Sequence, residues 1–207
     1  MSYNQKHILI HDPKTGYNTI ADQYGQYHKH LDSFDKGVFV KYFPRNENMA
    51  VIDLWAGDGR MFKYLSPLKP ERYVACDIAE KLLSRHPNNA GKVEKVVCNL
   101  EDPLPFENES FDLATSFFVL EHIEDVESLF SEIYRILKTW WIWIIGHFIQ
   151  RREFTRKKDK DQFRIEFYHH RIPDLEKLAH DCFFDIHLVP LREQGNIMGH
   201  IIVCKKT

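Results

Sequence analysis

Residues 49–61 constrain the fold of this chain more than any other stretch. Residues 50–54 form a short apolar run that holds one carboxylate, Asp53, and Gly57 and Gly59 follow it at once. This order predicts a strand that turns sharply into a helix. Glycines let the backbone approach a ligand closely, and the helix start offers unpaired N–H groups to a polar group. The stretch therefore predicts a binding site for a nucleotide-like molecule.

The pattern Asp-x-x-x-Gly-x-Gly at a strand end resembles motif I of the class I S-adenosylmethionine-dependent methyltransferases. That family has a further glycine at the position of Trp55, where an indole would stand beneath the methionine part of the cofactor. A dinucleotide-binding Rossmann domain also has spaced glycines after its first strand, so the rest of the chain has to discriminate. The resemblance implies that S-adenosylmethionine contacts the residues of this turn, which are Asp53, Leu54, Trp55, Gly57, Asp58 and Gly59.

Two further segments match the same family in order and spacing. Residues 72–77 read as a second strand that ends on Asp77, 24 residues after Asp53, where a βαβ nucleotide fold presents an acid to the ribose. The alternative role for Asp77 is capping the helix expected over residues 79–85. A third strand, residues 93–97, leads into an acidic loop that resembles the adenine-contacting loop of the family. The residues implied in ribose and adenine contacts are Asp77, Ile78, Asn99, Leu100 and Glu101, and a polar loop with turn prolines is the alternative for the last three.

Residues 108–123 carry the most specific signal, Ser-Phe-Asp-x-x-x-Ser-x-x-x-Leu-Glu-His, which is similar to the fourth-strand motif of the methyltransferase type 11 group. With it the resemblance covers roughly residues 17–150. Ser116 and Phe117 end this strand and are expected beside the cofactor. His122 is a candidate proton acceptor, or a residue that supports the loop and the start of the next helix.

The N-terminal segment predicts helices over the cofactor. Tyr17, Ile20, Ala21, Tyr24 and Tyr27 share one helix face, and the resemblance makes Tyr24 a candidate lid residue, with ordinary packing as the alternative. A second helix is expected over residues 33–42. His28 and His30 point away from each other on a helix, so we expect no metal there.

The last third predicts a basic loop over residues 150–161, a helix over 175–182 and a hairpin of two long strands. The basic loop is expected to be a solvated insert, with attraction of an anionic substrate or an RNA backbone as the alternative. The resembled enzymes place substrate-facing residues just before the helix over 175–182, which makes Tyr168, His169 and His170 candidates for lining the pocket of the methyl acceptor. His147 and His169 are further candidate bases. An antiparallel terminal hairpin fits the methyltransferase sheet and not a nicotinamide-binding domain.

Bulk properties exclude several classes. A net charge of −2 over 207 residues gives no global reason to bind DNA or an anionic membrane. No segment is long and apolar enough to span a bilayer, and the N-terminus lacks a signal-peptide core. The four cysteines stand singly in apolar surroundings, so we expect free buried thiols in a cytoplasmic protein.

Three of the four tryptophans, Trp55, Trp140 and Trp141, fall where the family pattern has glycine. Glycine is also scarce, at 9 of 207 residues against a usual share of about 7%. One hypothesis is that these positions are UGA codons that the source organism reads as glycine. The alternative is a diverged protein with an altered pocket. A genuine Trp55 predicts weak or absent cofactor binding and a strained fold.

The chain is therefore expected to form one α/β domain over residues 1–207, with a Rossmann-like seven-stranded sheet, mostly parallel with an antiparallel last strand, and helices on both faces. Its parts are a helical lid (1–45), a cofactor-binding core (46–150) and a C-terminal region (151–207). The resemblance implies methyl transfer from S-adenosylmethionine to an unidentified acceptor, first a small molecule and second a protein or RNA, without a metal or membrane. The alternative function is a non-catalytic scaffold whose cofactor cradle is blocked by Trp55.

Overall fold

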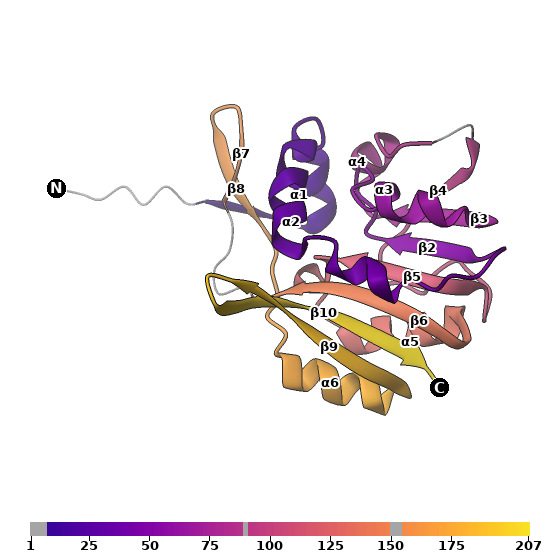
Figure 1. The fold of residues 1–207 in the computed structure, drawn as a ribbon. Helices are drawn as coiled ribbons and strands as arrows, with labels where there is room; N and C mark the ends of the chain where they lie inside the picture. The colour runs from indigo at the N-terminus through magenta and orange to yellow at the C-terminus, as the bar shows by residue number, and fades with distance from the viewer. Residues whose placement is uncertain (1–7, 89–90, 150–154) are drawn as a thin grey trace.

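The computed structural model describes residues 8–88, 91–149 and 155–207, and its centre is a seven-stranded sheet (Figure 1). All neighbouring strands in it are parallel except for β10, which runs antiparallel to both of its neighbours. This confirms the predicted sheet. Its strands, in spatial order, are β4 (Val93–Val97), β3 (Arg72–Asp77), β2 (Ala50–Leu54), β5 (Phe111–Phe117), β6 (Leu137–Phe148), β10 (Asn196–Lys206) and β9 (Phe184–Glu193).

The strand order reverses between β2 and β5, because the chain first builds β2, β3 and β4 outward on one side and then crosses back. The carboxyl ends of β2 and β5 therefore point into a crevice, which is where open α/β sheets bind ligands. Strand β5 is buried along its whole length, as expected of a central parallel strand. The turn after β2 opens at this crevice.

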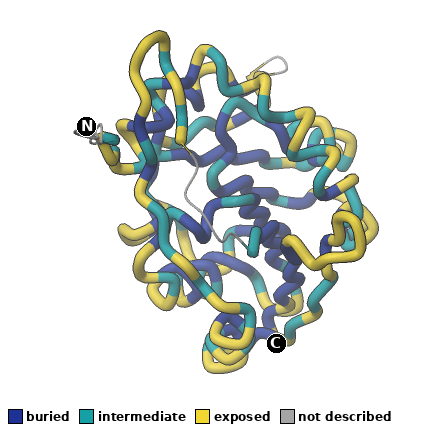
Figure 2. Tube along the Cα trace, turned by 90° about the vertical axis from the view of Figure 1, so that its left-hand side faces the viewer, coloured by how far each residue is buried: buried dark blue, intermediate teal, exposed yellow. Residues whose placement is uncertain are grey.

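Helices cover both faces of the sheet (Figure 1). One core forms where α5 and α6 pack on one face, and a second forms on the other face under η2, α3 and α4. Buried backbone follows the sheet through the middle of the molecule, and exposed backbone lies in the outer loops (Figure 2). The helices are α1 (Pro13–Ile20), α2 (His28–Asp35), α3 (Phe62–Leu65), α4 (Glu80–Ser84), α5 (Val126–Ile136) and α6 (Ile172–Asp181), with 3-10 turns η1 (Tyr24–Tyr27), η2 (Val38–Tyr42), η3 (Ser66–Leu68) and η5 (Leu120–His122).

A second, three-stranded sheet was not predicted. Strand β8 (Asp161–Ile165) pairs with β7 (Thr155–Lys158) as a hairpin and with β1 (Leu9–His11) in parallel. Phe163 and Ile165 are buried against α1 in a third core. The expectation of a loop is therefore wrong for residues 155–158, because their backbone pairs with β8, whereas residues 155–161 are exposed or half-buried, as expected of a solvated insert. Residues 150–154 of that insert lie outside the described residues.

The second predicted helix is also interrupted. Helix α2 ends at Asp35, because Lys36 and Gly37 adopt φ angles of 51° and 63°, and a separate turn, η2, follows. A left-handed residue at the C-terminus is the usual way to end a helix. The predicted helix over residues 33–42 is thus two short elements with different directions.

The prediction of four free thiols is wrong for one pair. Cys76 near the end of β3 and Cys98 just after β4 form a disulfide, with their Cα atoms 6.1 Å apart. The two strands are neighbours in the sheet, and that separation lies in the range that a disulfide spans. Cys182 and Cys204 are free thiols. The spacing in sequence did not indicate the pair, because the sheet register brings it together.

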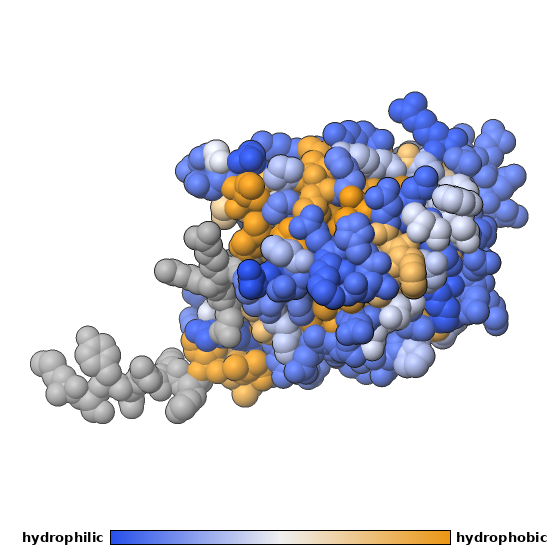
Figure 3. Space-filling view, turned by 90° about the horizontal axis from the view of Figure 1, so that it is seen from below, coloured by the Kyte–Doolittle hydropathy of each residue, from blue (hydrophilic) through white to orange (hydrophobic). Residues whose placement is uncertain are grey.

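Figure 3 shows the molecule from below the view of Figure 1. This face is mainly hydrophilic, with smaller hydrophobic areas between the polar side chains. Within the residues that the structure describes, no helix has the length and apolar character that a bilayer crossing requires. The same described segments contain no group of three His, Cys, Asp or Glu side chains suited to a metal ion.

Candidate functional site

The turn after β2, residues 55–59, has a backbone suited to holding a ligand, and we call this turn the cradle. Trp55, Gly57 and Gly59 adopt positive φ angles of 68°, 58° and 92°, so every second residue is left-handed. A Cβ at Gly59 would lie 2.4 Å from Cδ of Pro87, which leaves room only for glycine. Successive N–H groups in such a turn point to one side and form an anion-binding concavity. The sequence correctly placed this turn, and the structure sets it at the crevice between β2 and β5.

Asp77 closes one side of the cradle. Its Oδ2 accepts a hydrogen bond from the Gly57 N–H at 2.8 Å, and its Oδ1 accepts one from the Ala79 N–H at 2.8 Å. Burial raises the pKa of Asp77 to about 6, although these two hydrogen bonds oppose the shift. The structure thus brings Asp77 to the cradle as predicted, with both carboxylate oxygens engaged by backbone. Asp77 is not the N-cap of α4, because that position is Ala79, whose N–H donates to Asp77, and no side chain caps the helix.

Asp53 lies beneath the cradle on β2 and is 1% exposed. Its Oδ1 accepts a hydrogen bond from the Thr115 hydroxyl at 2.7 Å, while its Oδ2 has no partner among the described residues. Burial raises the pKa of Asp53 to about 7, opposed by the Thr115 hydrogen bond and by the charge of Arg60. A buried carboxylate oxygen without a partner at this point is a polar group that a ligand can satisfy.

Trp55 fills the space above this turn. Its indole stacks on the His122 ring, with centroids 5.7 Å apart and planes 18° from parallel. The Tyr17 ring meets the same indole edge-on at 5.6 Å. The cavity that remains against Gly57 and Asp58 has a volume of about 30 Å³. Sites for ligands of drug size hold about 300–1,000 Å³.

Of the remaining residues assigned to the cofactor, Asp58 and Phe117 line the small cavity at this turn, whereas Leu54, Ile78, Asn99, Leu100, Glu101 and Ser116 do not. The amide oxygen of Asn99 accepts a hydrogen bond from the Glu101 N–H at 3.3 Å. Glu101 is exposed, and its carboxylate accepts a hydrogen bond from the Glu124 N–H. The Ser116 hydroxyl accepts from Nε1 of Trp143 at 2.9 Å in the buried interior. Leu54, Leu100 and Phe117 are buried, and Ile78 is half-buried. Asp58 Oδ1 is hydrogen-bonded to His28 Nε2 at 2.5 Å.

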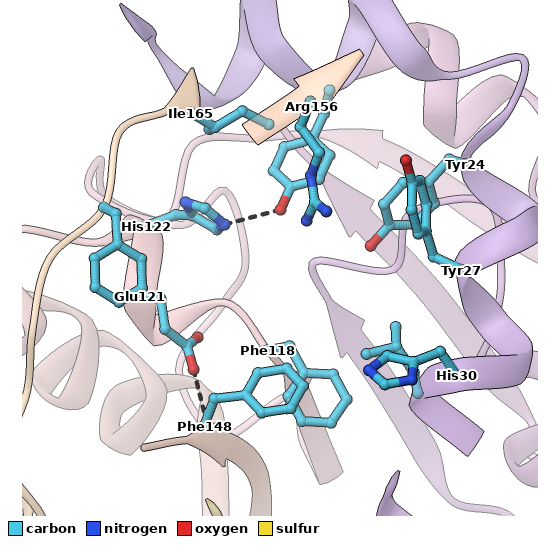
Figure 4. Close-up of a pocket in the computed structure, with 12 residues that line it drawn as sticks. Tyr24, Tyr27, His30, Phe118, Glu121, His122, Phe148, Arg156 and Ile165 are labelled. Carbon is cyan, nitrogen blue, oxygen red and sulfur yellow. Dashed lines mark hydrogen bonds between the residues drawn. The ribbon is translucent and has the colours of Figure 1, made fainter. Parts of the chain in front are cut away.

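A larger cavity of about 300 Å³ adjoins the cradle (Figure 4). The two cavities share the side chains of Tyr24, Leu31 and Phe118. In Figure 4, Glu121 and His122 line one side, Tyr24 and Tyr27 face them, and Arg156 reaches in from β7. Tyr24, the predicted lid residue, is therefore part of the wall between the cavities. Burial raises the pKa of Tyr24 to about 12, so its hydroxyl stays protonated at neutral pH.

The three candidate bases have different surroundings. His122 donates from Nδ1 to the Glu166 carbonyl at 2.7 Å, so its Nε2 accepts from the Tyr17 hydroxyl at 2.8 Å. Burial lowers the pKa of His122, which keeps this imidazole neutral. His147 is buried, with Nδ1 3.3 Å from Glu121 Oε1, and His169 is exposed. His122 is the only one of the three that lines the larger cavity within the described residues.

The C-terminal candidates lie beside this cavity. The Tyr168 N–H donates to the Glu121 carbonyl at 2.7 Å, and His170 Nε2 donates to the Ile123 carbonyl at 2.8 Å. The Tyr168 backbone and the His170 ring thus bond the segment after β5, and neither Tyr168, His169 nor His170 lines the cavity. Phe167, one residue earlier, lines the cavity itself.

Glu121 was not among the candidate residues. It is 3% exposed, and its Oε1 accepts from the Phe148 N–H at 2.8 Å. Its Oε2 has no partner among the described residues although Glu121 lines the cavity. The only indication of Glu121 in the sequence was the Leu-Glu-His motif, in which the histidine was the candidate base. Arg156 was not a candidate residue either, because nothing in the sequence indicated that the basic insert forms a hairpin over the cavity.

The sheet order, the glycine turn after β2 and the acid at the end of β3 together define the class I methyltransferase fold, whose members use S-adenosylmethionine as methyl donor. Residues 52–140 match the family model described as "Methyltransferase domain". The chain therefore has the fold of the class I S-adenosylmethionine-dependent methyltransferases, as the resemblance implied, and its residues 52–140 resemble a methyltransferase domain.

Curated relatives are distant. The chain is 27% identical over 178 residues to a ubiquinone/menaquinone biosynthesis C-methyltransferase of Rickettsia prowazekii, covering 77% of this chain and 66% of that protein. It is 24% identical over 141 residues to 24-methylenesterol C-methyltransferase 2 of Arabidopsis thaliana, covering 66% and 39%. Over 95 residues it is 32% identical to a human mitochondrial protein named an arginine-hydroxylase, covering 46% and 27%. The chain thus spans less than two thirds of each of these relatives.

Solved structures share the fold over most of the chain. The PH0226 protein of Pyrococcus horikoshii superposes with a TM-score of 0.73 at 20% identity, covering 94% of this chain and 99% of that one. A Listeria monocytogenes protein described as a putative S-adenosylmethionine-dependent methyltransferase gives 0.72 at 14% identity, covering 86% and 98%. At these identities the likeness establishes the fold.

The polar groups of the cradle suit S-adenosylmethionine, but the space does not. The left-handed glycine turn, Asp77 and the unpartnered oxygen of Asp53 are the donors and acceptors that such a site needs. The indole of Trp55 packs against Tyr17 and His122 and lines the residual cavity at the turn, which is about a tenth of the size of a typical ligand site. As arranged here, the chain does not accommodate the cofactor of its class.

Proposed function

We propose that this protein transfers a methyl group from S-adenosylmethionine to a small molecule once the cradle is cleared of the Trp55 indole. The observation that carries this proposal is the convergence of Gly57, Gly59 and Asp77 at the switch point of the sheet. The names of two curated relatives, which refer to quinone biosynthesis and to a sterol, support a small-molecule acceptor. A cytoplasmic location is part of the same proposal.

Fold and family do not decide the reaction, because related folds support different chemistries. One sequence relative illustrates this, because the human protein is named an arginine-hydroxylase. A scaffold without catalysis receives no support from the comparisons. In the proposed enzyme, Asp77 would hold the ribose, Asn99 and Leu100 would flank the adenine, and the turn at Gly57 would receive the methionine end. The bound cofactor would supply an electrophilic methyl group.

Calorimetric titration of S-adenosylhomocysteine tests the cofactor assignment. We expect micromolar binding by Trp55→Gly and weak or absent binding by the parent chain, because glycine both empties the cradle and accepts φ of 68°. Trp140→Gly is the matched control. Position 140 lies near the start of β6, at the opposite end of the sheet from the carboxyl end of β2, so this substitution should not change binding.

The outcomes separate clearly. Equal binding by parent and Trp55→Gly would show that the indole moves aside, and the proposed function would stand. Absence of binding by both forms would contradict the assignment of the cofactor to this cradle.

A further inference from the structure

The larger cavity contains a buried acceptor atom that the fold does not use. Glu121 is held by the Phe148 N–H on Oε1, and His147 Nδ1 approaches the same oxygen at 3.3 Å. Oε2 of the same carboxylate has no partner among the described residues. Burial opposes ionisation of this group, but His147 and the Phe148 N–H outweigh it and lower the pKa of Glu121, so the carboxylate is charged at neutral pH.

A charged oxygen that is buried without a partner costs free energy unless something donates to it. The candidate donors in the neighbourhood are engaged elsewhere. Tyr17 donates its hydroxyl to His122, His122 donates Nδ1–H to the Glu166 carbonyl, and His147 Nε2 lies 3.2 Å from the His170 carbonyl. The site is therefore built around an acceptor that a guest molecule can satisfy.

Much of the rest of the cavity wall is aromatic. Six phenylalanine and tyrosine rings line it, and Phe118 and Phe148 stack with centroids 4.2 Å apart. Arg156 lies over the Tyr27 ring at 5.0 Å and adds a positive charge at the side opposite Phe148 (Figure 4). Flat ring systems pack well between such walls. The six rings belong to Tyr17, Tyr24, Tyr27, Phe118, Phe148 and Phe167.

We propose that this cavity binds the methyl acceptor as a flat, ring-bearing molecule that donates an N–H or O–H hydrogen bond to Oε2 of Glu121. The proposal deepens the proposed function and rests on it for the word acceptor, because the cavity shares three side chains with the cradle.

Two probe pairs of matched shape test the proposal. Indole and 1-methylindole differ in one N–H, and 2-naphthol and 2-methoxynaphthalene differ in one O–H. We expect the parent chain to bind the donor member of each pair at least about ten-fold more tightly, because a hydrogen bond to a buried carboxylate is stronger than a neutral one. Ligand-observed NMR titration gives the affinities.

Glu121→Gln should reduce the preference to about two-fold or less, since the amide keeps an acceptor for the Phe148 N–H but has no charge to offer the guest. Glu124→Gln is the matched control, because Glu124 is exposed three residues away, and it should keep the ten-fold preference. The probe pairs on the parent chain decide the question even where Glu121→Gln does not fold.

Equal affinity within both pairs would overturn the proposal, and so would a preference that survives Glu121→Gln. Absence of binding by all four probes would overturn it as well. The cofactor titration is independent of these results: binding of S-adenosylhomocysteine with no donor preference refutes only the acceptor class. A clear donor preference without S-adenosylhomocysteine binding by either the parent chain or Trp55→Gly refutes only the proposed function.

Discussion

At the scale of single residues, the two tryptophans with left-handed backbone stand apart from the other two. Trp55 and Trp140 have φ angles of 68° and 74°, the largest among the non-glycine residues of the described segments. A left-handed conformation costs an ordinary residue about 1–2 kcal/mol, and glycine nothing comparable. Trp143 has no exposed surface and donates Nε1–H to the Ser116 hydroxyl, so its pocket is shaped for an indole.

Trp140→Gly should therefore raise the free energy of unfolding by about 1 kcal/mol, because the side chain is 67% exposed and its backbone is left-handed. Trp141→Gly is the matched control and should lower it, since Trp141 packs against both cores and has no positive φ. Urea denaturation of the two variants measures the difference. A loss of stability in Trp140→Gly equal to that in Trp141→Gly would contradict the prediction.

The coding sequence provides a second test at this scale. The hypothesis of reassigned codons predicts UGA at positions 55 and 140, and at 141 by the family pattern, with glycine in the protein isolated from its source. The packing of Trp143 predicts UGG at that position. Sequencing the gene and the intact mass of the native protein check both statements. Four UGG codons would remove the hypothesis and leave a diverged pocket.

At the scale of elements, α2 is fastened to the cradle by one buried ion pair. Arg60, the residue after Gly59, donates to Asp35 at 2.7 Å, and Asp35 has no exposed surface. Arg60 also contacts Asp32 at 3.2 Å, but that side chain is 26% exposed. The guanidinium lies over the Phe117 ring as well. Loss of the buried partner would leave a desolvated charge between the helix and the sheet.

We expect Asp35→Asn to lower the free energy of unfolding by about 3 kcal/mol, the usual cost of removing one partner of a buried pair. Asp32→Asn should cost less than about 1 kcal/mol, because water screens a partly exposed carboxylate. Chemical denaturation of both variants makes the comparison. Similar losses in the two would show that α2 is not fastened through Asp35.

The elements also show what the sequence could predict. Strands β2, β3 and β4 and their ligand-facing ends followed from apolar runs bounded by glycine, acid or turn residues, and the parallel order followed from the resemblance. The β7–β8 hairpin could not be predicted, because its four-residue edge strand is basic and has no apolar alternation. The Cys76–Cys98 pair and the partnerless oxygen of Glu121 depend on register and packing, which no local pattern contains.

At the scale of the whole molecule, two buried aspartates connect stability to pH. Burial raises the pKa of Asp53 to about 7 and that of Asp77 to about 6, against an ordinary value of 3.8. Between about pH 4 and 7 these two carboxyl groups therefore bind more protons in the folded protein than in the unfolded chain. Their contribution to the free energy of unfolding must fall as pH rises through this window.

Asp53→Asn removes the larger contribution while keeping an oxygen for the Thr115 hydroxyl. Its stability relative to the parent should increase between pH 4 and pH 7 and stay constant above that, because the amide does not ionise. Urea denaturation of both proteins at pH 4.5, 6 and 8 gives the curve, and Asp77 contributes equally to both. A difference that is flat or shrinks with rising pH would show that Asp53 is ionised in the folded protein throughout.

The shared wall between the two cavities has a thermodynamic consequence. Tyr24, Leu31 and Phe118 form part of both cavities, so a guest on one side would contact the same side chains as a guest on the other. Linkage then requires reciprocity: the factor by which S-adenosylhomocysteine changes the affinity for indole must equal the factor by which indole changes the affinity for S-adenosylhomocysteine. The three side chains would make the two halves of the site one cooperative unit.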